Sequence, residues 1–543
     1  MKNNSERDPR ARRIIRGAAL LALALGVMGC GTPKVRQQPE LKALAERLDE
    51  IETVKLAEKS RSEPVSIEQA TKQLTAAVTE PNQAQPVMKL TLEEVRAAAL
   101  ANNLDLKVQL VSPSLAQQII DIERAKFESV FRASAGYDRK ELEEGVWSRR
   151  SYEAGTVTPL PTGGTIVTNV PVADSDGVAD AAASVSVIQS LLRGAGTRVN
   201  TYSIQVATYQ KGAFDAITKL QAINILVGAD VAYWRLYQAR KQLDISREQY
   251  KLAQNQLKYA RLKVEAGSAP KNEIVRAEAG LSGRLDAVIG AETAVRDRER
   301  DLKRIMNRSD LPLNSPVGIL TMTEPEPMGL DLDQESLVAA ALENRTELAE
   351  LEFRLAIGDI EIAQARNDLL PLLTLEYAYA ANGQAGDAAG AFEGLFDDPL
   401  QDHSVRLSAA IPLGNQAAKA QYRRARLEKI RAELSREQQK QRIRQEVHDA
   451  VDGLEQNWRR ILAAEQGVVA EYRNYRVEQS QFQLGRRTST EVLRAASDLA
   501  EAQLRRIAAF ADYEIAQVLL ARATGTLLGR GQVQLQPVSL EGK

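Results

Sequence analysis

Residues that could do chemistry are few in this chain of 543 residues. His403 and His448 are its two histidines, and Cys30 is its single cysteine. No G-x-S-x-G, H-E-x-x-H or Walker pattern surrounds them. Zinc and haem sites draw on several histidine or cysteine ligands, so this inventory argues against both. The sequence predicts a protein that is not an enzyme and holds no metal or cofactor.

One pair of glycines has the setting of a phosphate-binding turn. Gly194 and Gly196 lie between a predicted strand and a predicted helix, where backbone N–H groups can cradle a phosphate. Val199 occupies the place of the third glycine, and the next predicted strand begins only near Leu373, so no βαβ unit exists. A tight bend from strand to helix explains the glycines better. The net charge of -1 gives no general attraction for nucleic acid.

The place of Cys30 is informative. A basic segment precedes an apolar run, Gly17–Gly29, that is too short to span a bilayer, which is typical of a secretion signal. The ending VMGC resembles a bacterial lipobox, although Met28 is an uncommon occupant. We expect a signal peptide at residues 1–29, lipidation of Cys30, and sorting to the cell outer membrane because Gly31 follows. The alternative is a plain signal peptide whose cysteine is removed or left free.

Long helices are the main structural elements that the sequence predicts. Between Gln416 and about Gln483 no proline occurs, and apolar residues recur three, four or seven positions apart. At 1.5 Å per residue this helix would be about 100 Å long, which is too long for a compact domain. Gly485 ends it, while Thr488 and Glu491 mark the start of a return helix. The result is a long antiparallel helical hairpin, preceded by an alternating strand.

The chain is a tandem duplication. AAALANN at residues 97–103 matches AAALENR at 339–345, and EAGSAPKNEIVRAEAGL at 265–281 matches QLGRRTSTEVLRAASDL at 483–499. This alignment pairs Gly267 with Gly485, Glu273 with Glu491 and Arg276 with Arg494. Each half therefore has one predicted order: helix, strand, loop, strand, very long helix, tip and return helix.

Four strands are expected, two in each half. They lie at about residues 127–139, 183–191 and 373–381, and from residue 403 onward. Each alternates apolar with polar residues, and strands of this length with one apolar face suit an outer-membrane barrel. The segments between them, about residues 142–182 and 382–402, are rich in Gly, Asp, Ala and Pro, so we expect loops there.

The domain boundaries follow from this order. We expect a lipid-anchored N-terminal extension at 30–89, a first structural repeat at 90–308, an equatorial linker at 309–330, a second repeat at 331–528 and a C-terminal tail at 529–543. In each repeat, two half-length helices stacked end to end would match one full-length helix. The proline-rich linker would then lie at mid-height.

Four strands cannot close a barrel by themselves. An open sheet edge in lipid leaves backbone groups unpaired, at several kcal/mol each. The strands must therefore be pooled between copies of the chain. Two copies would give eight strands and a plugged interior, and three would give twelve and room for a channel.

The segments SLLRGAGTRVN (190–200) and IPLGNQAAKAQYRRARLE (411–428), together with the duplicated hairpin, resemble the outer-membrane efflux protein family, the TolC-like exit ducts. The resemblance covers about residues 90–528. It implies an α+β membrane protein: a homotrimeric 12-stranded β-barrel, with four strands per chain, that continues into a long periplasmic α-helical barrel. Ser190 stands where the second half has Pro412, so the first strand-to-helix bend departs from the family pattern.

The resemblance also implies a function and partners. Such a duct is a passive channel of a tripartite efflux or type I secretion system. It lies in outer-membrane lipid, docks onto a periplasmic adaptor (membrane fusion) protein and serves an inner-membrane transporter. The alternative is a periplasmic coiled-coil lipoprotein with a structural or tethering role, which predicts no alternating strands.

The helical tips carry the residues matched to the family's function. Gly267 and Gly485 match tip glycines, which implies that an adaptor contacts them and the neighbouring Ser268, Arg486 and Arg487.

Glu491 matches an acidic position that narrows the periplasmic entrance, and a ring of such carboxylates would attract cations. Arg494 stands where a second acid often occurs, with Arg487 before it. We infer an entrance gate held by pairs of Glu491 with Arg494 or Arg487 between tips. The alternative is solvated ion pairs worth less than about 1 kcal/mol.

Overall fold

The computed structural model of this chain describes residues 86–142, 145–175, 177–397, 399–484 and 486–530, together with residues 67 and 69. It divides into two compact units, Met1–Ala84 and Gln85–Lys543, and all the elements named below lie in the second. The predicted signal peptide, Cys30 and Gly485 fall outside the described residues. Every described helix is too short or too polar to cross a membrane.

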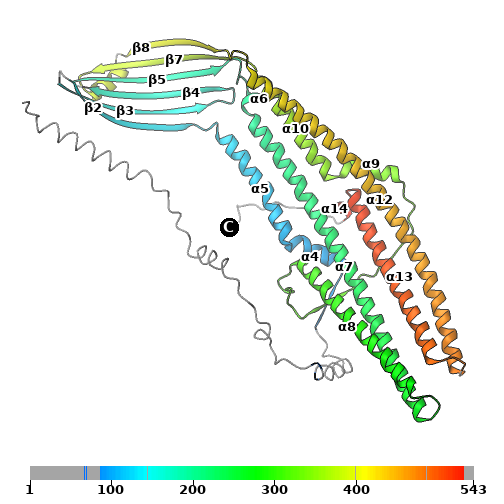
Figure 1. Cartoon of the computed structure of the whole chain (residues 1–543). Helices are drawn as coiled ribbons and strands as arrows, with labels where there is room; N and C mark the ends of the chain where they lie inside the picture. Colours follow the sequence, from blue (N-terminus) through cyan, green and yellow to red (C-terminus); the bar gives the residue numbers. More distant parts are fainter. Residues whose placement is uncertain are drawn as a thin grey trace, which may run out of the picture. The chain divides into compact units, whose positions relative to one another are not determined.

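The unit that begins at Gln85 combines very long helices with one large sheet, and Figure 1 shows the sheet at one end of the helices and the hairpin tips at the other. The helices are α4 (Leu92–Asn102), α5 (Leu104–Ala125), α6 (Thr197–Asn200), α7 (Tyr202–Glu265), α8 (Asn272–Met306), α9 (Gln334–Asn344), α10 (Thr346–Asn367), α11 (Ala388–Asp397), α12 (Gln416–Gln483), α13 (Ser489–Ala523) and α14 (Leu527–Arg530). The strands are β1 (Val87–Leu90), β2 (Val130–Leu142), β3 (Gly145–Pro159), β4 (Gly164–Ser175), β5 (Val178–Ser190), β6 (Gly318–Thr321), β7 (Leu372–Ala385) and β8 (Leu400–Ala410).

The half-length helices stack end to end along the long ones, as their lengths predict. Asn103, which caps α5, donates its side-chain N–H to the carbonyl of Ile305 near the end of α8, at 3.0 Å. In the second half, Arg345 between α9 and α10 donates to the carbonyl of Ala523, the last residue of α13, at 3.2 Å. Each junction therefore satisfies polar groups at the helix ends that would otherwise lack partners.

Apolar stripes hold the helices together. On α12, Ile443, Val447, Val451 and Leu454 recur at helical spacing and are buried, while the rest of this polar helix is mostly exposed. They pack in one cluster with residues of α13 such as Tyr513. Buried alanines of α13, such as Ala509 and Ala516, fill the same cluster between the larger side chains.

The linker between the halves is fixed at the middle of the helices. Its strand β6 pairs in parallel with β1. The buried Lys303 of α8 donates to the carbonyls of Ser315 and Val317 at 2.9 and 2.8 Å, and burial lowers the pKa of its ammonium group. Tyr233, near the middle of α7, donates its hydroxyl to the carbonyl of Leu90 at 3.2 Å.

A single six-stranded sheet has the order β2-β3-β4-β5-β7-β8, and every neighbouring pair is antiparallel. The prediction of four strands per chain was therefore wrong. Residues 145–175, expected to be part of a loop, form β3 and β4. Their Gly, Pro and charged residues weaken the apolar alternation by which a strand is recognised, but long ladders on both sides hold them in the sheet. The other predicted loop contains α11 and the ends of β7 and β8.

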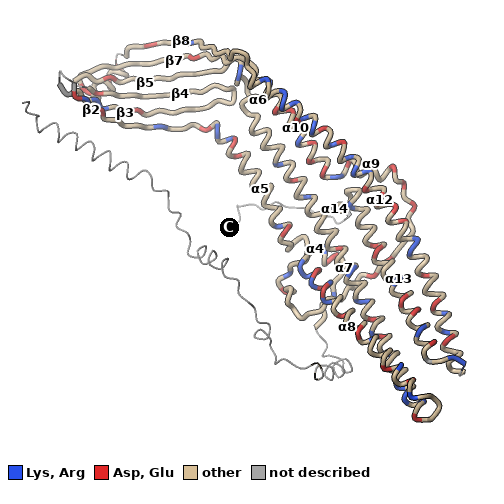
Figure 2. The backbone as a smooth tube through the Cα atoms, in the orientation of Figure 1, with Lys and Arg blue, Asp and Glu red and all other residues tan. Residues whose placement is uncertain are grey.

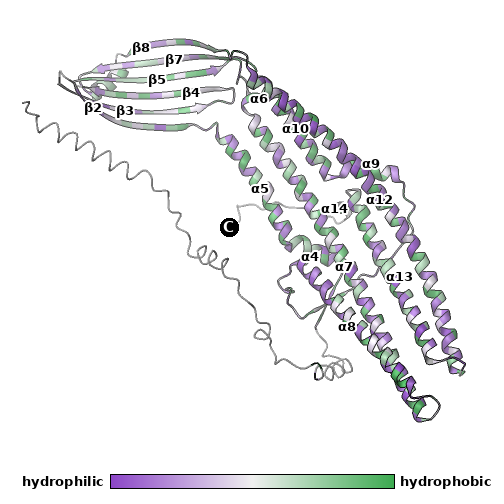
Figure 3. Cartoon of the chain, in the orientation of Figure 1, coloured by the Kyte–Doolittle hydropathy of each residue, from purple (hydrophilic) through white to green (hydrophobic). Residues whose placement is uncertain are grey.

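The two faces of the sheet differ, and Figure 3 shows the resulting alternation of hydropathy along the strands. The register places on one face Phe131, Ala133, Ala135 and Tyr137 of β2, Val185 and Val187 of β5, Leu375 and Tyr377 of β7, and Val405 and Leu407 of β8. The opposite face carries polar pairs, such as Asn169 donating to Glu153 at 2.7 Å and Arg406 with Glu376 at 3.8 Å. A sheet with these two faces suits lipid on one side and water on the other.

Helix α11 covers the far end of the apolar face. Its Ala391 and Leu395 form a buried cluster with Ala179 and Ala181 of β5. A side chain at Gly383 of β7 would meet the carbonyl of Ala391 at 2.3 Å, so the glycine allows the helix to lie directly on the strand.

The first bend from strand to helix is well defined although Ser190 replaces a proline there. The N–H of Leu191 donates to the carbonyl of Leu373 at 2.8 Å. The N–H of Gly194 donates to the side chain of Asn367 at 2.8 Å, and Gly194 has a φ of 79°. Hydrogen bonds to the second half therefore fix this bend, and its glycines serve the turn, as the sequence predicts.

Candidate functional site at the helix tips

The first tip joins α7 to α8. Gly267 adopts a φ of 70°, in the left-handed region that favours glycine. The next residue, Ser268, donates its backbone N–H and its hydroxyl to the carbonyl of Lys263, at 2.9 and 3.0 Å. Apart from its chain neighbours, no described residue has an atom within 4 Å of where a Cβ of Gly267 would be. The tip is thus closed by its own backbone and leaves an open surface.

The second tip joins α12 to α13 and is built around Glu491. This carboxylate accepts from the N–H of Thr488 at 2.7 Å, and the Thr488 side chain caps the helix in return. Arg487 donates to the other oxygen of Glu491 at 2.8 Å and lies 3.3 Å from Glu478. One arginine therefore links the end of α12 to the start of α13.

The charges of this tip stabilise each other. The N–H of Thr488 and the guanidinium of Arg487 lower the pKa of Glu491, so it is ionised at neutral pH. Its hydrogen bond to Glu491 raises the pKa of Arg487. Both side chains lie at the surface, where water and salt screen such pairs.

Arg494 is not part of this arrangement. It is exposed and forms no ion pair with any other described residue of the chain. Within one chain Glu491 therefore pairs with Arg487. In the first tip the matched residues do pair, because Arg276 lies 3.1 Å from Glu273. The tips differ although their sequences align.

The two tips also touch, a contact that the sequence analysis missed. The ammonium of Lys263, at the end of α7, lies 4.4 Å from the ring centroid of Phe482 at the end of α12. Higher up, Arg284 of α8 donates to Ser497 of α13 at 2.8 Å. No local pattern signals these pairs, since they depend on which helices of the two halves become neighbours. Figure 2 shows acidic and basic residues mixed along the helices down to the tips.

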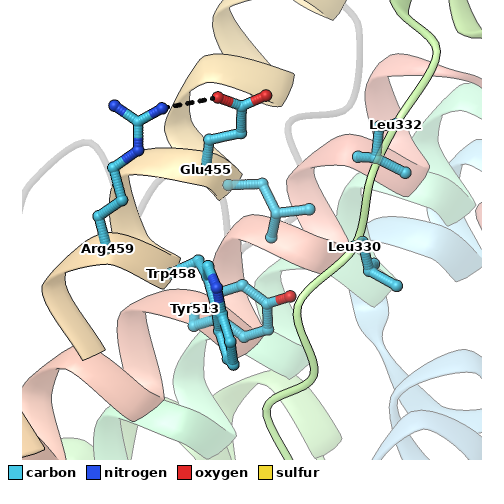
Figure 4. Close-up of a pocket in the computed structure, with 7 residues that line it drawn as sticks. Leu330, Leu332, Glu455, Trp458, Arg459 and Tyr513 are labelled. Atoms are coloured by element: carbon cyan, nitrogen blue, oxygen red, sulfur yellow. Dashed lines mark ion pairs between the residues drawn. The ribbon is translucent and has the colours of Figure 1, made fainter. Parts of the chain in front are cut away.

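Other places for chemistry are sparse in the described part of the chain. A cavity of about 190 Å³ lies where the linker passes α12 and α13, with Leu330, Trp458 and Tyr513 in its wall and an Arg459–Glu455 ion pair at 3.5 Å (Figure 4). Tyr513 donates its hydroxyl to the carbonyl of Met328, which fixes the linker.

The two histidines lie apart in ordinary polar contacts, His403 beside Tyr377 and His448 beside Gln334. No group of three or more metal-ligating side chains occurs among the described residues.

Comparisons with known proteins agree with this architecture. Residues 337–526 match the family Outer membrane efflux protein. The chain is 24% identical over 319 residues to the outer membrane efflux protein BepC of Brucella suis, covering 58% of this chain and 67% of BepC. It is 24% identical over 241 residues to the alkaline protease secretion protein AprF of Pseudomonas aeruginosa, covering 42% of this chain and 47% of AprF.

Solved structures share the fold. The outer-membrane channel CmeC of Campylobacter jejuni superposes with a TM-score of 0.63 at 14% identity, covering 80% of this chain and 86% of CmeC. The outer-membrane channel OprN gives a TM-score of 0.61 at 17% identity, covering 80% of this chain and 90% of OprN. At these identities the likeness concerns the fold alone.

The long paired helices that end in a sheet form the TolC-like α+β fold, which the channels CmeC and OprN share. By sequence, residues 337–526 match the outer membrane efflux protein family, which confirms the resemblance. This is a family of channels rather than of enzymes, and its members lie in the outer membrane.

Proposed function

We propose that this protein is the passive outer-membrane exit channel of a tripartite efflux or type I secretion system. The observation that carries the proposal is the six-stranded sheet, which has one apolar and one polar face. Helices about 100 Å long continue from this sheet. The apolar face suits lipid, the polar face suits a wet lumen, and the helices suit a duct through the periplasm. A coiled-coil tether would need no such sheet.

The sheet needs further copies of the chain to become a wall. Among the described residues, the outer strands β2 and β8 each pair with one neighbouring strand, so the other edge of each has no partner there. Free edges in lipid are costly, and closing the sheet between copies removes them. A homotrimer is the assembly that we propose, in line with the resemblance to TolC-like ducts.

The tips are the proposed docking site for a periplasmic adaptor, which in turn would bind an inner-membrane transporter. Gly267 and Ser268 present an open backbone turn, and Arg486 and Arg487 are exposed on the second tip. Cys30 is the proposed lipid attachment site. Arg487 and Glu491 would form the entrance gate, with Arg494 left free to face the tip of a neighbouring copy.

The test is to purify the protein from the outer membrane and insert it into planar bilayers. A channel gives single-channel conductance, whereas a tether gives none. Palmitate labelling of the protein and of a Cys30→Ser variant tests the lipid anchor separately. Crosslinking from Ser268→Cys and Arg486→Cys tests the adaptor contact, with Ser336→Cys at mid-height as the control position. Absence of conductance from a folded, membrane-inserted protein would contradict the proposal.

A further inference from the structure

The sheet contains two more strands than a four-stranded contribution to a shared barrel requires. Both lie between β2 and β5, so this β3–β4 hairpin separates the two strands that the sequence predicted for the first half. β3 pairs with β2 along the whole of β2, and β4 pairs with both β3 and β5. The hairpin is therefore part of the wall and not a loop beside it.

The inner turn of the hairpin is built into the bend between β5 and α6. The carbonyl of Thr162 accepts from the N–H of Gly196 at 2.9 Å and from the side chain of Gln189 at 2.9 Å. Gly163 has a φ of 85°, and a Cβ there would lie 2.0 Å from the carbonyl oxygen of Gly194. Only glycine fits this contact, so the turn of the hairpin is held in one position next to the helices.

The hairpin also leaves the alternation of side chains between the two faces of the sheet unchanged. Odd-numbered residues of β2 and of β5, such as Ala133 and Val187, lie on the apolar face. Removing residues 145–175 would leave Glu143, Glu144, Asp176 and Gly177 as a four-residue loop, with β2 and β5 still antiparallel and their apolar residues still on one face.

The outer strands are ready to pair between copies. β2 and β8 run antiparallel to each other because six strands alternate in direction. Their apolar side chains are exposed in the described part of one chain: Phe131 is 68% exposed and Val405 is 73% exposed. A second copy of this chain supplies an antiparallel neighbour with a matching apolar face.

We infer that three copies close an 18-stranded barrel and not a 12-stranded one. This rests on the proposed channel function and trimer, and concerns the width of the wall. Barrel diameter grows roughly linearly with strand number, so the membrane segment would be about 1.5 times as wide as a twelve-stranded one. At eighteen strands a barrel keeps an open aqueous lumen, which fits cargo too bulky for a twelve-stranded exit.

Disulfide crosslinking in the full-length protein gives the first test. Ala133 and Ala154 are direct partners of β2 and β3, within reach of a disulfide. The pair Ala133→Cys and Ala154→Cys should crosslink nearly completely within one chain. The pair Ala133→Cys and Val187→Cys should not, because two strands separate these positions. In a variant lacking residues 145–175 the second pair should crosslink instead.

Electron microscopy of the purified assembly gives the second test. The full-length barrel should show three-fold symmetry and a diameter about 1.5 times that of the deletion variant. A crosslink between positions 133 and 187 in the full-length protein, a twelve-stranded trimer or a two-fold ring of twelve strands would overturn the inference. If the deletion variant does not fold, the full-length crosslinks and strand count decide alone. A conducting twelve-stranded trimer would leave the channel function intact, whereas a folded protein without conductance would remove that function instead.

Discussion

Arg487 donates to Glu491 at 2.8 Å, and Glu491 in turn accepts the N–H of Thr488 at the start of α13. One carboxylate thus both caps a helix and holds the only arginine that bridges to Glu478 on α12 among the described residues. Glu491 therefore connects the start of α13 to the end of α12 through Arg487.

Replacing Glu491 with Ala should weaken the cation preference of the channel without dissociating the assembly. The substitution removes one negative charge per copy from the proposed entrance and leaves Arg487 facing it. The shift of the reversal potential in a salt gradient across a planar bilayer measures this. Glu273→Ala in the first tip is the matched control and should change selectivity less. Unchanged selectivity in Glu491→Ala would contradict the gate.

The cation preference should survive mild acidification. The pKa of Glu491 is lowered by Thr488 and Arg487, so the carboxylate stays ionised as the pH falls through about 4.3, the usual value for Glu. Because the folded pKa is the lower one, the contribution to tip stability is present above the unfolded value and is lost as the pH falls through the folded value.

Replacing Arg487 with Gln should move the loss of selectivity to a higher pH, since one cause of the lowered pKa disappears. Reversal potentials between pH 7 and pH 3.5 follow the transition. A transition in the unsubstituted channel at or above the ordinary glutamate value would contradict this assignment.

Gly163→Val should destabilise the barrel strongly. The new Cβ would lie 2.0 Å from a backbone oxygen, in a left-handed conformation that valine avoids. Gly177→Ala is a control with nearly the same φ, 86°, but apart from its chain neighbours no described atom lies within 4 Å of the added Cβ, so it should cost about 1 to 2 kcal/mol. The temperature at which the assembly dissociates on a gel measures both. Equal losses of thermal stability in the two variants would show that the turn does not pack against Gly194 as described.

Asp230→Ala should destabilise the helical part strongly. Asp230 is fully buried and binds Arg96 through two hydrogen bonds at 2.7 and 2.6 Å, which raise the pKa of Arg96. Removing one partner of a buried pair costs about 3 to 5 kcal/mol. Asp215→Ala, at an exposed pair with Lys211, should cost less than about 0.5 kcal/mol. Thermal unfolding followed by circular dichroism compares them, and similar midpoints would contradict the prediction.

Much of the fold could be predicted from sequence because its signals are local. The proline-free run of α12 and the alternation of Val405 and Leu407 each depend on neighbouring residues alone. The hairpin β3–β4 was missed because Pro171, Gly155 and the charged pair Arg149–Arg150 interrupt its pattern. Its strands are specified mainly by their partners across the sheet, which no local pattern reveals.

The tip shows the same distinction. The spacing of Thr488 and Glu491 is that of a capping box and was readable from the sequence. Whether Arg487 or Arg494 would pair with Glu491 depended on how the turn folds. The contact of Lys263 with Phe482 depended on helix neighbours and was out of reach of the sequence.

The parallel pairing of β1 with β6 has a mechanical consequence for the proposed acyl anchor. It holds β1 beside Tyr233, near the middle of α7 and roughly 50 Å from the end of that helix. The residues between Cys30 and Val87 could reach about 180 Å if fully extended. This length exceeds that distance. A lipid on Cys30 would therefore keep the protein at the bilayer without setting how deep the barrel lies in it.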